Sequence, residues 1–165
     1  MTSTTHKVWK LGSNIDTDVL APGAYMKLGI EGIAPHCLES VRPDFASQVK
    51  RGDVVVAGAG FGIGSSREQA AAALAYLGVA AVIAPSYSGL FFRNAFNVGL
   101  LLLTCQQADL LQENEHVTLD LIGLQIVSTA HGKLAIEPIP DFLVDMVNAG
   151  GLMKQLRARL EKGLA

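Results

Sequence analysis

Runs of apolar residues alternate with helical patterns through the middle of the chain. The apolar runs are rich in Val, Ile and Leu and are bounded by Gly or Pro, which is typical of buried strands. We expect these strands at 54–57, 79–84 and 100–103. Helices are expected between them, at 66–77 and 87–97, with Ser86 as the cap of the second. Because strands alternate with helices, the pattern predicts a parallel sheet with loops at the carboxyl ends of its strands.

The flanking regions predict shorter elements. Before residue 54 we expect a strand at 8–11, an acidic loop at 12–18, a glycine-punctuated loop at 28–35 and a short helix opening at 43–46. After residue 104 we expect a short helix at 108–112, a hairpin of 117–121 with 124–127, a strand at 134–136 and helices at 140–146 and 152–160.

The last predicted helix has an apolar stripe formed by Leu152, Met153, Leu156 and Leu160, which is typical of a core or subunit contact. Neither an internal repeat nor a linker interrupts the chain. We therefore expect one α/β domain over 1–165, with its motifs between about 7 and 151, a small β extension after 115 and a C-terminal helix at 152–162.

Composition excludes several classes of protein. Of the 165 residues, 50% are hydrophobic and 17% are charged, which argues against disorder. A net charge of −2 and 6% aromatic residues argue against a nucleic-acid partner. The charge-free stretch 70–92 contains Gly78 and Pro85, so helix, turn and strand explain it better than a membrane span. The polar start, Met1 to Lys7, has no signal-peptide pattern, and we expect a cytoplasmic protein.

Cysteine and histidine usage argues against a metal site on this chain. The two cysteines, Cys37 and Cys105, are too few for the three or more thiolates that an iron–sulfur cluster usually needs. The four histidines show no ligand spacing. We expect no metal and no cofactor here.

The segment Gly58 to Glu68 (GAGFGIGSSRE) carries the candidate chemistry, since it links a predicted strand to a predicted helix. Its alternating glycines would let backbone N–H groups approach a ligand, and the helix start adds unpaired donors. Arg67 adds a fork of donors suited to a carboxylate, beside the hydroxyls of Ser65 and Ser66. This combination suits acid–base work on a small carboxylic acid.

Two better-known glycine loops do not fit this segment. The dinucleotide fingerprint fails because the required third glycine is absent, and the phosphate-binding P-loop fails because no lysine is present. A plainer interpretation remains: Ser65 with Glu68 forms a capping box, which only starts a helix.

Three motifs together resemble the small subunits of aconitase-superfamily hydro-lyases, of which the 3-isopropylmalate dehydratase type is closest. They are the segments 14–18 (NIDTD), 64–68 (GSSRE) and 91–94 (FFRN). The resemblance implies a swivelling β/β/α domain, as in the aconitase C-terminal domain. It also implies a partner, a large subunit that carries a [4Fe–4S] cluster, and a role in leucine biosynthesis.

The resemblance further implies roles for individual residues. Ser65 would be the catalytic base, and Asp18 would face a histidine of the partner subunit. Gly64, Ser66 and Arg67 would bind substrate, with Arg67 on a carboxylate. A serine is a poor base unless its alkoxide is stabilised, and loop N–H groups with Arg67 would provide that stabilisation.

The chain departs from the family pattern at several positions. Gln69 replaces a histidine and Ile63 a frequent cysteine. The specificity segment, often Tyr-Leu-Arg-Thr, consists here of Tyr25, Met26, Lys27 and Leu28. Lys27 keeps the charge for substrate binding but loses the fork geometry.

The implied reaction is dehydration and rehydration of a 2-hydroxy dicarboxylic acid, with 3-isopropylmalate first among the substrates. Homoaconitate, citraconate or methylmalate, and dimethylmalate are alternatives within the same reaction class. A non-catalytic, carboxylate-binding regulatory domain is the alternative from another class.

Overall fold

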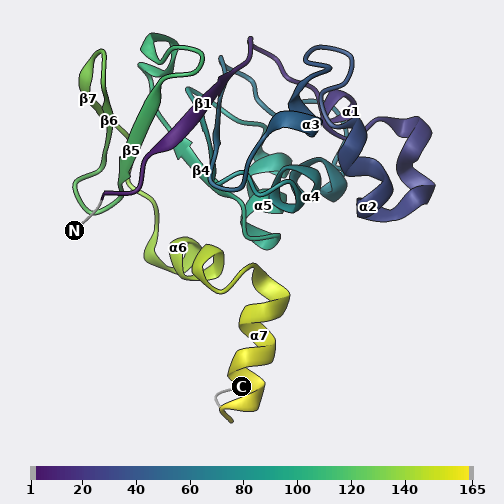
Figure 1. Ribbon diagram of the computed structural model, residues 1–165. Coiled ribbons are helices and arrows are strands. Elements are labelled where there is room, and N and C mark those ends of the chain that lie inside the picture. The colour runs from purple at the N-terminus through teal and green to yellow at the C-terminus, as the bar shows by residue number, and fades with distance from the viewer. Residues whose placement is uncertain (1–2, 164–165) are drawn as a thin grey trace.

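The computed structural model describes residues 3–163, whose strands form one seven-stranded sheet of order β4-β3-β2-β1-β5-β6-β7 (Figure 1). The strands are β1 (His6–Lys10), β2 (Val54–Val56), β3 (Ala81–Ala84), β4 (Leu101–Thr104), β5 (His116–Asp120), β6 (Gln125–Ser128) and β7 (Gly132–Ala135). The mixed α/β fold agrees with the class that the sequence predicts.

Strands β1 to β4 are parallel and form the buried half of the sheet. All residues of β2 and β3 are buried, which explains why their sequences read as continuous apolar runs instead of alternating ones. Helices α4 (Glu68–Tyr76) and α5 (Gly89–Asn97) follow β2 and β3 and pack on each other. The buried strands and the helices between them are thus confirmed, although each helix begins two residues later than the pattern predicts.

Strands β5, β6 and β7 extend the sheet as an antiparallel meander, and β5 pairs antiparallel with β1. Val117, Ile126 and Leu134 are buried on this half, while residues beside them in sequence are more exposed. This alternation is typical of a sheet with one wet face. The predicted hairpin and the strand after it are confirmed.

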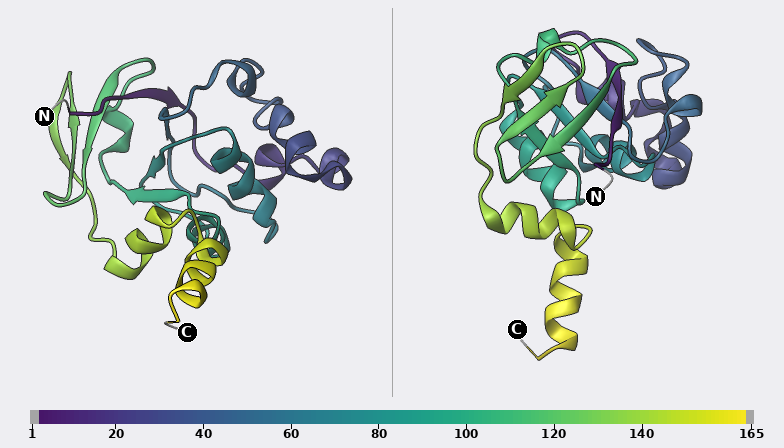
Figure 2. Two further views of the ribbon diagram at one scale, coloured as in Figure 1. Left: turned by 60° about the horizontal axis from the view of Figure 1, so that its bottom comes forward. Right: turned by 60° about the vertical axis from the view of Figure 1, so that its left-hand side comes forward.

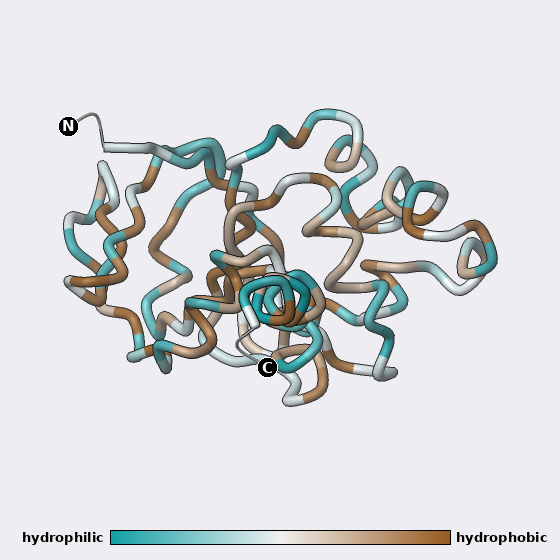
Figure 3. Tube along the Cα trace, turned by 90° about the horizontal axis from the view of Figure 1, so that it is seen from below, coloured by the Kyte–Doolittle hydropathy of each residue, from teal (hydrophilic) through white to brown (hydrophobic). Residues whose placement is uncertain are grey.

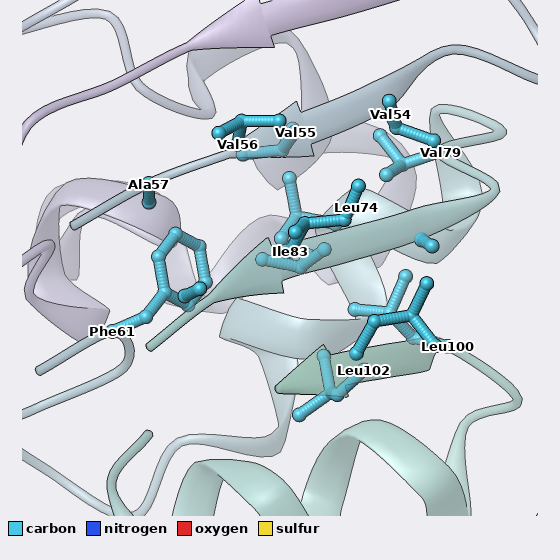
Figure 4. Packing of buried hydrophobic residues seen from close by; sticks show 14 of the residues in the cluster. Val54, Val55, Val56, Ala57, Phe61, Leu74, Val79, Ile83, Leu100 and Leu102 are labelled. Atoms are coloured by element: carbon cyan, nitrogen blue, oxygen red, sulfur yellow. The ribbon is translucent and has the colours of Figure 1, made fainter. Parts of the chain in front are cut away.

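The core continues through both sides of β2 and β3 (Figure 4), where Leu74 of α4, Leu102 of β4 and the preceding Leu100 pack with Ile83. On β1, the fully buried Trp9 packs edge-on against Phe45, with ring centroids 5.3 Å apart. Its indole N–H donates to Asp53 Oδ2 over 2.8 Å, so the buried polar tip of the ring has a partner.

The connection between β1 and β2 consists largely of short helices. They are α1 (Thr17–Leu20), η1 (Gly23–Leu28), α2 (Gly29–Ile33), η2 (Ala34–His36) and α3 (Phe45–Gln48). The predicted loop at 28–35 is therefore wrong. Glycines lower helix propensity there, but burial of Ile33 and packing of α2 on α4 overcome that preference.

The chain ends in α6 (Asp141–Asn148) and α7 (Leu152–Glu161), after η3 (Ala108–Leu110) in the β4–β5 connection. Figures 1 and 2 show α7 projecting from the body of the molecule. Met153 and Leu160 are 62% and 64% exposed, so the stripe on α7 is not part of this chain's core. Figure 3, which looks along α7, shows hydrophilic and apolar positions around it.

The direction of α7 is set where Gly151 precedes it. This residue has φ +113°, and a Cβ there would lie 2.6 Å from the carbonyl oxygen of Asn97 at the end of α5. Only glycine fits both the backbone conformation and the contact. Of the helices in residues 3–163, none is long and apolar enough to cross a membrane.

Candidate active site

The loop between β2 and α4 carries the candidate residues, at the carboxyl edge of the parallel strands. The N–H groups of Gly58, Gly60 and Gly62 already donate to acceptors within the chain, at 3.1, 2.9 and 2.7 Å. The expectation that the alternating glycines offer donors to a ligand is therefore wrong for these three, and of the four only Gly64 keeps an N–H without an acceptor among residues 3–163. They instead let other segments of the chain pack closely on the loop.

Gly62 shows this packing most clearly. Its φ is +79°, and a Cβ would lie 2.2 Å from Cγ of Phe91 on α5. From the same helix, Asn94 donates its side-chain N–H to the carbonyl of Ser66 over 3.1 Å. The motif at 91–94 thus supports the loop from beneath and fixes the backbone on which Ser65 and Ser66 are displayed.

Ser65 is exposed and does not cap a helix. Helix α4 begins at Glu68, its N-cap position is Arg67, and that position has no side-chain cap bond. The capping-box interpretation is therefore wrong. The prediction that Ser86 caps the next helix is also wrong. Ser88 is the residue that precedes α5, and the Ser86 hydroxyl accepts from Gly60 N–H instead. The hydroxyl of Ser65 lies 3.2 Å from the hydroxyl of Thr17, within hydrogen-bond distance.

Thr17 is a site residue that sequence reasoning missed. It is 1% exposed, and its backbone N–H donates to the carbonyl of Ile63 over 2.8 Å. The segment after β1 therefore runs beside the glycine loop, and Thr17 is held under Ser65. The position of Thr17 between Asp16 and Asp18 in the NIDTD motif was the one sequence signal for its role. Its contact with Ser65 depends on the fold and could not be predicted from that motif.

Unpaired backbone donors surround Ser65. Within residues 3–163, the N–H groups of Gly64, Ser65 and Ser66 have no hydrogen-bond acceptor. They directly precede the N-terminus of α4, where the first-turn N–H groups carry partial positive charge. A carboxylate or an oxyanion fits such a cluster of donors.

Arg67 and Asp18 form an ion pair across the two segments. Arg67 Nη1 also donates to the carbonyl of Ala21 over 2.9 Å, and Asp18 Oδ1 accepts from Gly23 N–H over 3.2 Å. The Arg67 guanidinium beside Asp18 holds the pKa of that carboxyl below its ordinary value. Asp18 is therefore ionised at neutral pH, and it orients the guanidinium.

The specificity segment is helical and adjoins this pair through Gly23, the first residue of η1. Tyr25 and Met26 are half-buried, whereas Lys27 and Leu28 are exposed. The Tyr25 ring stacks on His36 with centroids 3.5 Å apart, and His36 Nδ1 lies 2.6 Å from Glu39 Oε2. The nearby Glu39 carboxylate raises the pKa of Tyr25. The stack anchors one end of the segment, and Lys27 stays free to reach solvent or a ligand.

A cavity of about 290 Å³ lies between α2 and α4, lined by Ile30, Glu68, Gln69 and Ala72. Gln69, where the family pattern has a histidine, thus faces this cavity on the first turn of α4. The site itself is open, because Gly64, Ser65 and Ser66 are all exposed. A second surface is needed to exclude water from it.

Cys37 and Cys105 are buried free thiols, and burial raises the pKa of each. Both stay protonated at neutral pH, which makes them poor metal ligands. Among the described residues, no group of three or more His, Cys, Asp or Glu side chains is arranged to hold a metal ion.

Comparison with known proteins supports the sequence interpretation. The sequence family described as the aconitase C-terminal domain matches residues 39–108. The 3-isopropylmalate dehydratase small subunit 1 of Archaeoglobus fulgidus is 44% identical over 158 residues, covering 93% of this chain and 98% of that protein. The methanogen homoaconitase small subunit of Methanothermobacter thermautotrophicus is 40% identical over 162 residues, covering 96% of this chain and 94% of that protein.

A solved structure has the same fold. The crystal structure of 3-isopropylmalate dehydratase from Methanocaldococcus jannaschii superposes with a TM-score of 0.89 at 37% identity, and the match covers 96% of each chain. The resemblance drawn from the three motifs and the fold class that it implied are both confirmed.

The ion pair between Arg67 and Asp18 gives a direct test of the site's electrostatics. In a carbon-detected NMR titration, the pKa of the Asp18 carboxyl should lie below the ordinary value of an aspartate, because the Arg67 guanidinium stabilises its charged form. In the Arg67→Gln variant the midpoint should rise, because the charged donor is lost. Asp120 is the control: its pKa is lowered by Gly123 N–H and Gln125, so it should not move. An unchanged Asp18 midpoint would show that the pair does not form in solution.

Proposed function

This chain belongs to the family of 3-isopropylmalate dehydratase small subunits and is thus the small subunit of a hydro-lyase, in which we propose that Ser65 is the base. One observation carries the proposal. The exposed Ser65 hydroxyl lies 3.2 Å from the buried Thr17 hydroxyl, among unpaired N–H groups and next to Arg67. Serine becomes basic only where its alkoxide is stabilised, and these groups supply that stabilisation.

The proposed reaction removes water from a 2-hydroxy dicarboxylic acid and adds it back in the other orientation. Ser65 Oγ takes the proton from the carbon next to the hydroxyl-bearing carbon, while the hydroxyl group leaves with its bonding electron pair. Proton and hydroxide together make the water that is lost, so the step balances. In the reverse direction, Ser65 returns the proton to the double bond.

Arg67 and the free N–H groups hold the substrate for this transfer. The guanidinium keeps donors beyond the Nη1 that bonds Asp18 and Ala21, and a substrate carboxylate can occupy them. Asp18 fixes the plane of that fork. The N–H groups of Gly64 and Ser66 flank Ser65 in sequence and favour negative charge on its oxygen.

As a small subunit, the chain works with a large-subunit partner, on which we place a [4Fe–4S] cluster. Two buried, protonated thiols do not fit such a cluster on this chain. When bound, the cluster supplies a Lewis acid for the leaving hydroxyl group. The exposed Ser65 surface then faces the large subunit, which excludes water from the cleft. We also propose that the assembled enzyme is cytoplasmic.

The substrate that we favour is 3-isopropylmalate, because relatives named for that dehydratase match nearly the whole chain. Homoaconitate is the second candidate, since a relative named for homoaconitase is 40% identical over a similar length. The segment from Tyr25 to Leu28 adjoins Arg67 through Gly23, and we assign the choice of substrate side chain to it.

Ser65→Ala should lower kcat by about two to four orders of magnitude in the complex with the large subunit, since a general base contributes on that scale. The fold should be unaffected, because Ser65 is exposed and caps no helix. The measurement is exchange of the substrate proton in deuterated water, accompanied by a thermal melt.

Ser66→Ala is the matched control for Ser65→Ala and should be much milder. Proton exchange at the wild-type rate in the Ser65 variant would exclude Ser65 as the base. A separate outcome would favour the regulatory-domain alternative: a wild-type complex that binds substrate but shows no turnover.

Thr17→Val should lower kcat by about tenfold with little change in KM, because it removes one hydrogen bond to the proposed alkoxide and keeps the side-chain shape. Thr17→Ser should restore the rate, since it keeps the hydroxyl. The pH–rate profile separates a positioning role from packing: loss of the bond should raise the pKa of the Ser65 hydroxyl and so move the acidic limb of the profile to higher pH. A variant with an unshifted profile and a lower melting temperature would make Thr17 purely structural.

Replacing Tyr25–Leu28 with Tyr-Leu-Arg-Thr should change the order of preference among 2-hydroxy diacids more than the rate on the best one. The exchange replaces the point charge of Lys27 by the planar fork of an arginine. A fork of donors binds a carboxylate in a more defined orientation than a lysine does, so the preference among substrate side chains should change. The measurement is kcat/KM over a panel that includes 3-isopropylmalate and homoaconitate. An unaltered order would remove this segment from the specificity argument.

A further inference from the structure

A groove of about 610 Å³ lies between the β5–β6 turn and α6. Its floor is apolar and includes Leu121, Ile139 and Val144, and Ile122 at its edge is 99% exposed. Its charged lining residues among those described are both acidic, Asp141 and Asp145. An exposed apolar surface rimmed by like charges is typical of a protein contact.

Helix α7 contacts α5 and α6, but its apolar side chains are left largely uncovered among the described residues, and the nearest charges beside them are basic. Met153, Leu156 and Leu160 are exposed and follow one another at helical spacing. At about 100° per residue, Arg157 lies on one side of this stripe and Arg159 on the other. The helix therefore presents an apolar stripe with an arginine on each side, and Glu161 lies farther round the helix on the Arg157 side.

The two surfaces cannot meet within one molecule. None of the α7 residues lines the groove, and Figures 1 and 2 show the helix pointing away from the body, with its direction fixed at Gly151. The apolar floor matches the apolar stripe, and the acidic rim matches the basic flanks. The complementarity is therefore between copies of the chain.

We propose that α7 of one copy docks in the groove of a second copy, and that the second copy returns the contact. In a two-fold dimer each chain gives one helix and one groove, so the contact is made twice. The apolar stripe supplies the buried area, while Asp141 and Asp145 facing Arg157 and Arg159 fix the orientation. This inference does not depend on the proposed function, since Figure 1 shows α1 and the start of α4 at the other end of the molecule from β6.

The test exchanges the charges of the two surfaces. The groove variant is Asp141→Lys with Asp145→Lys, and the helix variant is Arg157→Glu with Arg159→Glu. Sedimentation of the full-length chain should give a dimer for the wild type, and each variant alone should weaken it at least about tenfold because like charges then meet. An equal mixture of the two variants should restore the dimer, since both contacts of the mixed pair become complementary again.

The mixture also shows that both variants are folded. Glu31→Lys with Asp109→Lys, two exposed sites away from the groove lining and from α7, is the control of equal charge change and should leave the dimer intact. A wild-type chain that stays monomeric, variants that dimerise normally, or a mixture that stays monomeric would each overturn the proposal. So would variants that keep the dimer but fail to bind the large subunit, because the groove would then belong to that partner.

Discussion

The pairing of β1 with β2 does not stop where the strands stop, and the site depends on this continuation. Beyond the sheet, Asn14 N–H donates to Ala59, Gly62 N–H to Ile15 and Thr17 N–H to Ile63, over 2.7–2.8 Å. The two loops therefore run side by side in a fixed register, as extensions of neighbouring parallel strands. This register sets Thr17 under Ser65 and Asp18 against Arg67. Residues 48 positions apart in sequence become neighbours through main-chain bonds, before any side chain contributes.

The need for close approach explains the composition of the loop. Gly62 rests on Phe91, and its N–H is already used by Ile15, so the glycines make room for the scaffold. Among residues 3–163, the loop N–H groups without an acceptor are those of Gly64, Ser65 and Ser66, although the carbonyl of Ser66 accepts from Asn94. The first part of the loop thus serves mainly for packing, and the part that follows carries the candidate site residues. This division is consistent with a rigid site on an exposed loop, held from below by α5 through Asn94.

The sequence predicted those parts of the fold that local patterns determine. Apolar content predicted buried strands such as 54–57, and turn residues between two apolar runs predicted the hairpin over Ile122 and Gly123. The failures had another cause. The capping interpretation of Ser65, the role of the glycine N–H groups and the loop at 28–35 all depended on contacts with distant segments, which no local pattern encodes. The motif resemblance identified Ser65, Arg67 and Asp18 as candidate site residues. Thr17 could be identified only from the structure, because its place beside Ser65 depends on the register between two loops.

The direction set at Gly151 decides where the tip of α7 lies. Ten residues at 1.5 Å each give a rod about 15 Å long, so a rotation of 10° at its base moves the tip by about 2–3 Å. A Cβ at residue 151 would lie 2.6 Å from the carbonyl oxygen of Asn97, so the base of α7 packs closely on the end of α5, the helix whose Asn94 also bonds the loop at Ser66. The start of α7 and the loop that displays Ser65 therefore both rest on α5. One helix thus joins the base of the projecting C-terminal helix to the loop that carries the exposed Ser65 hydroxyl.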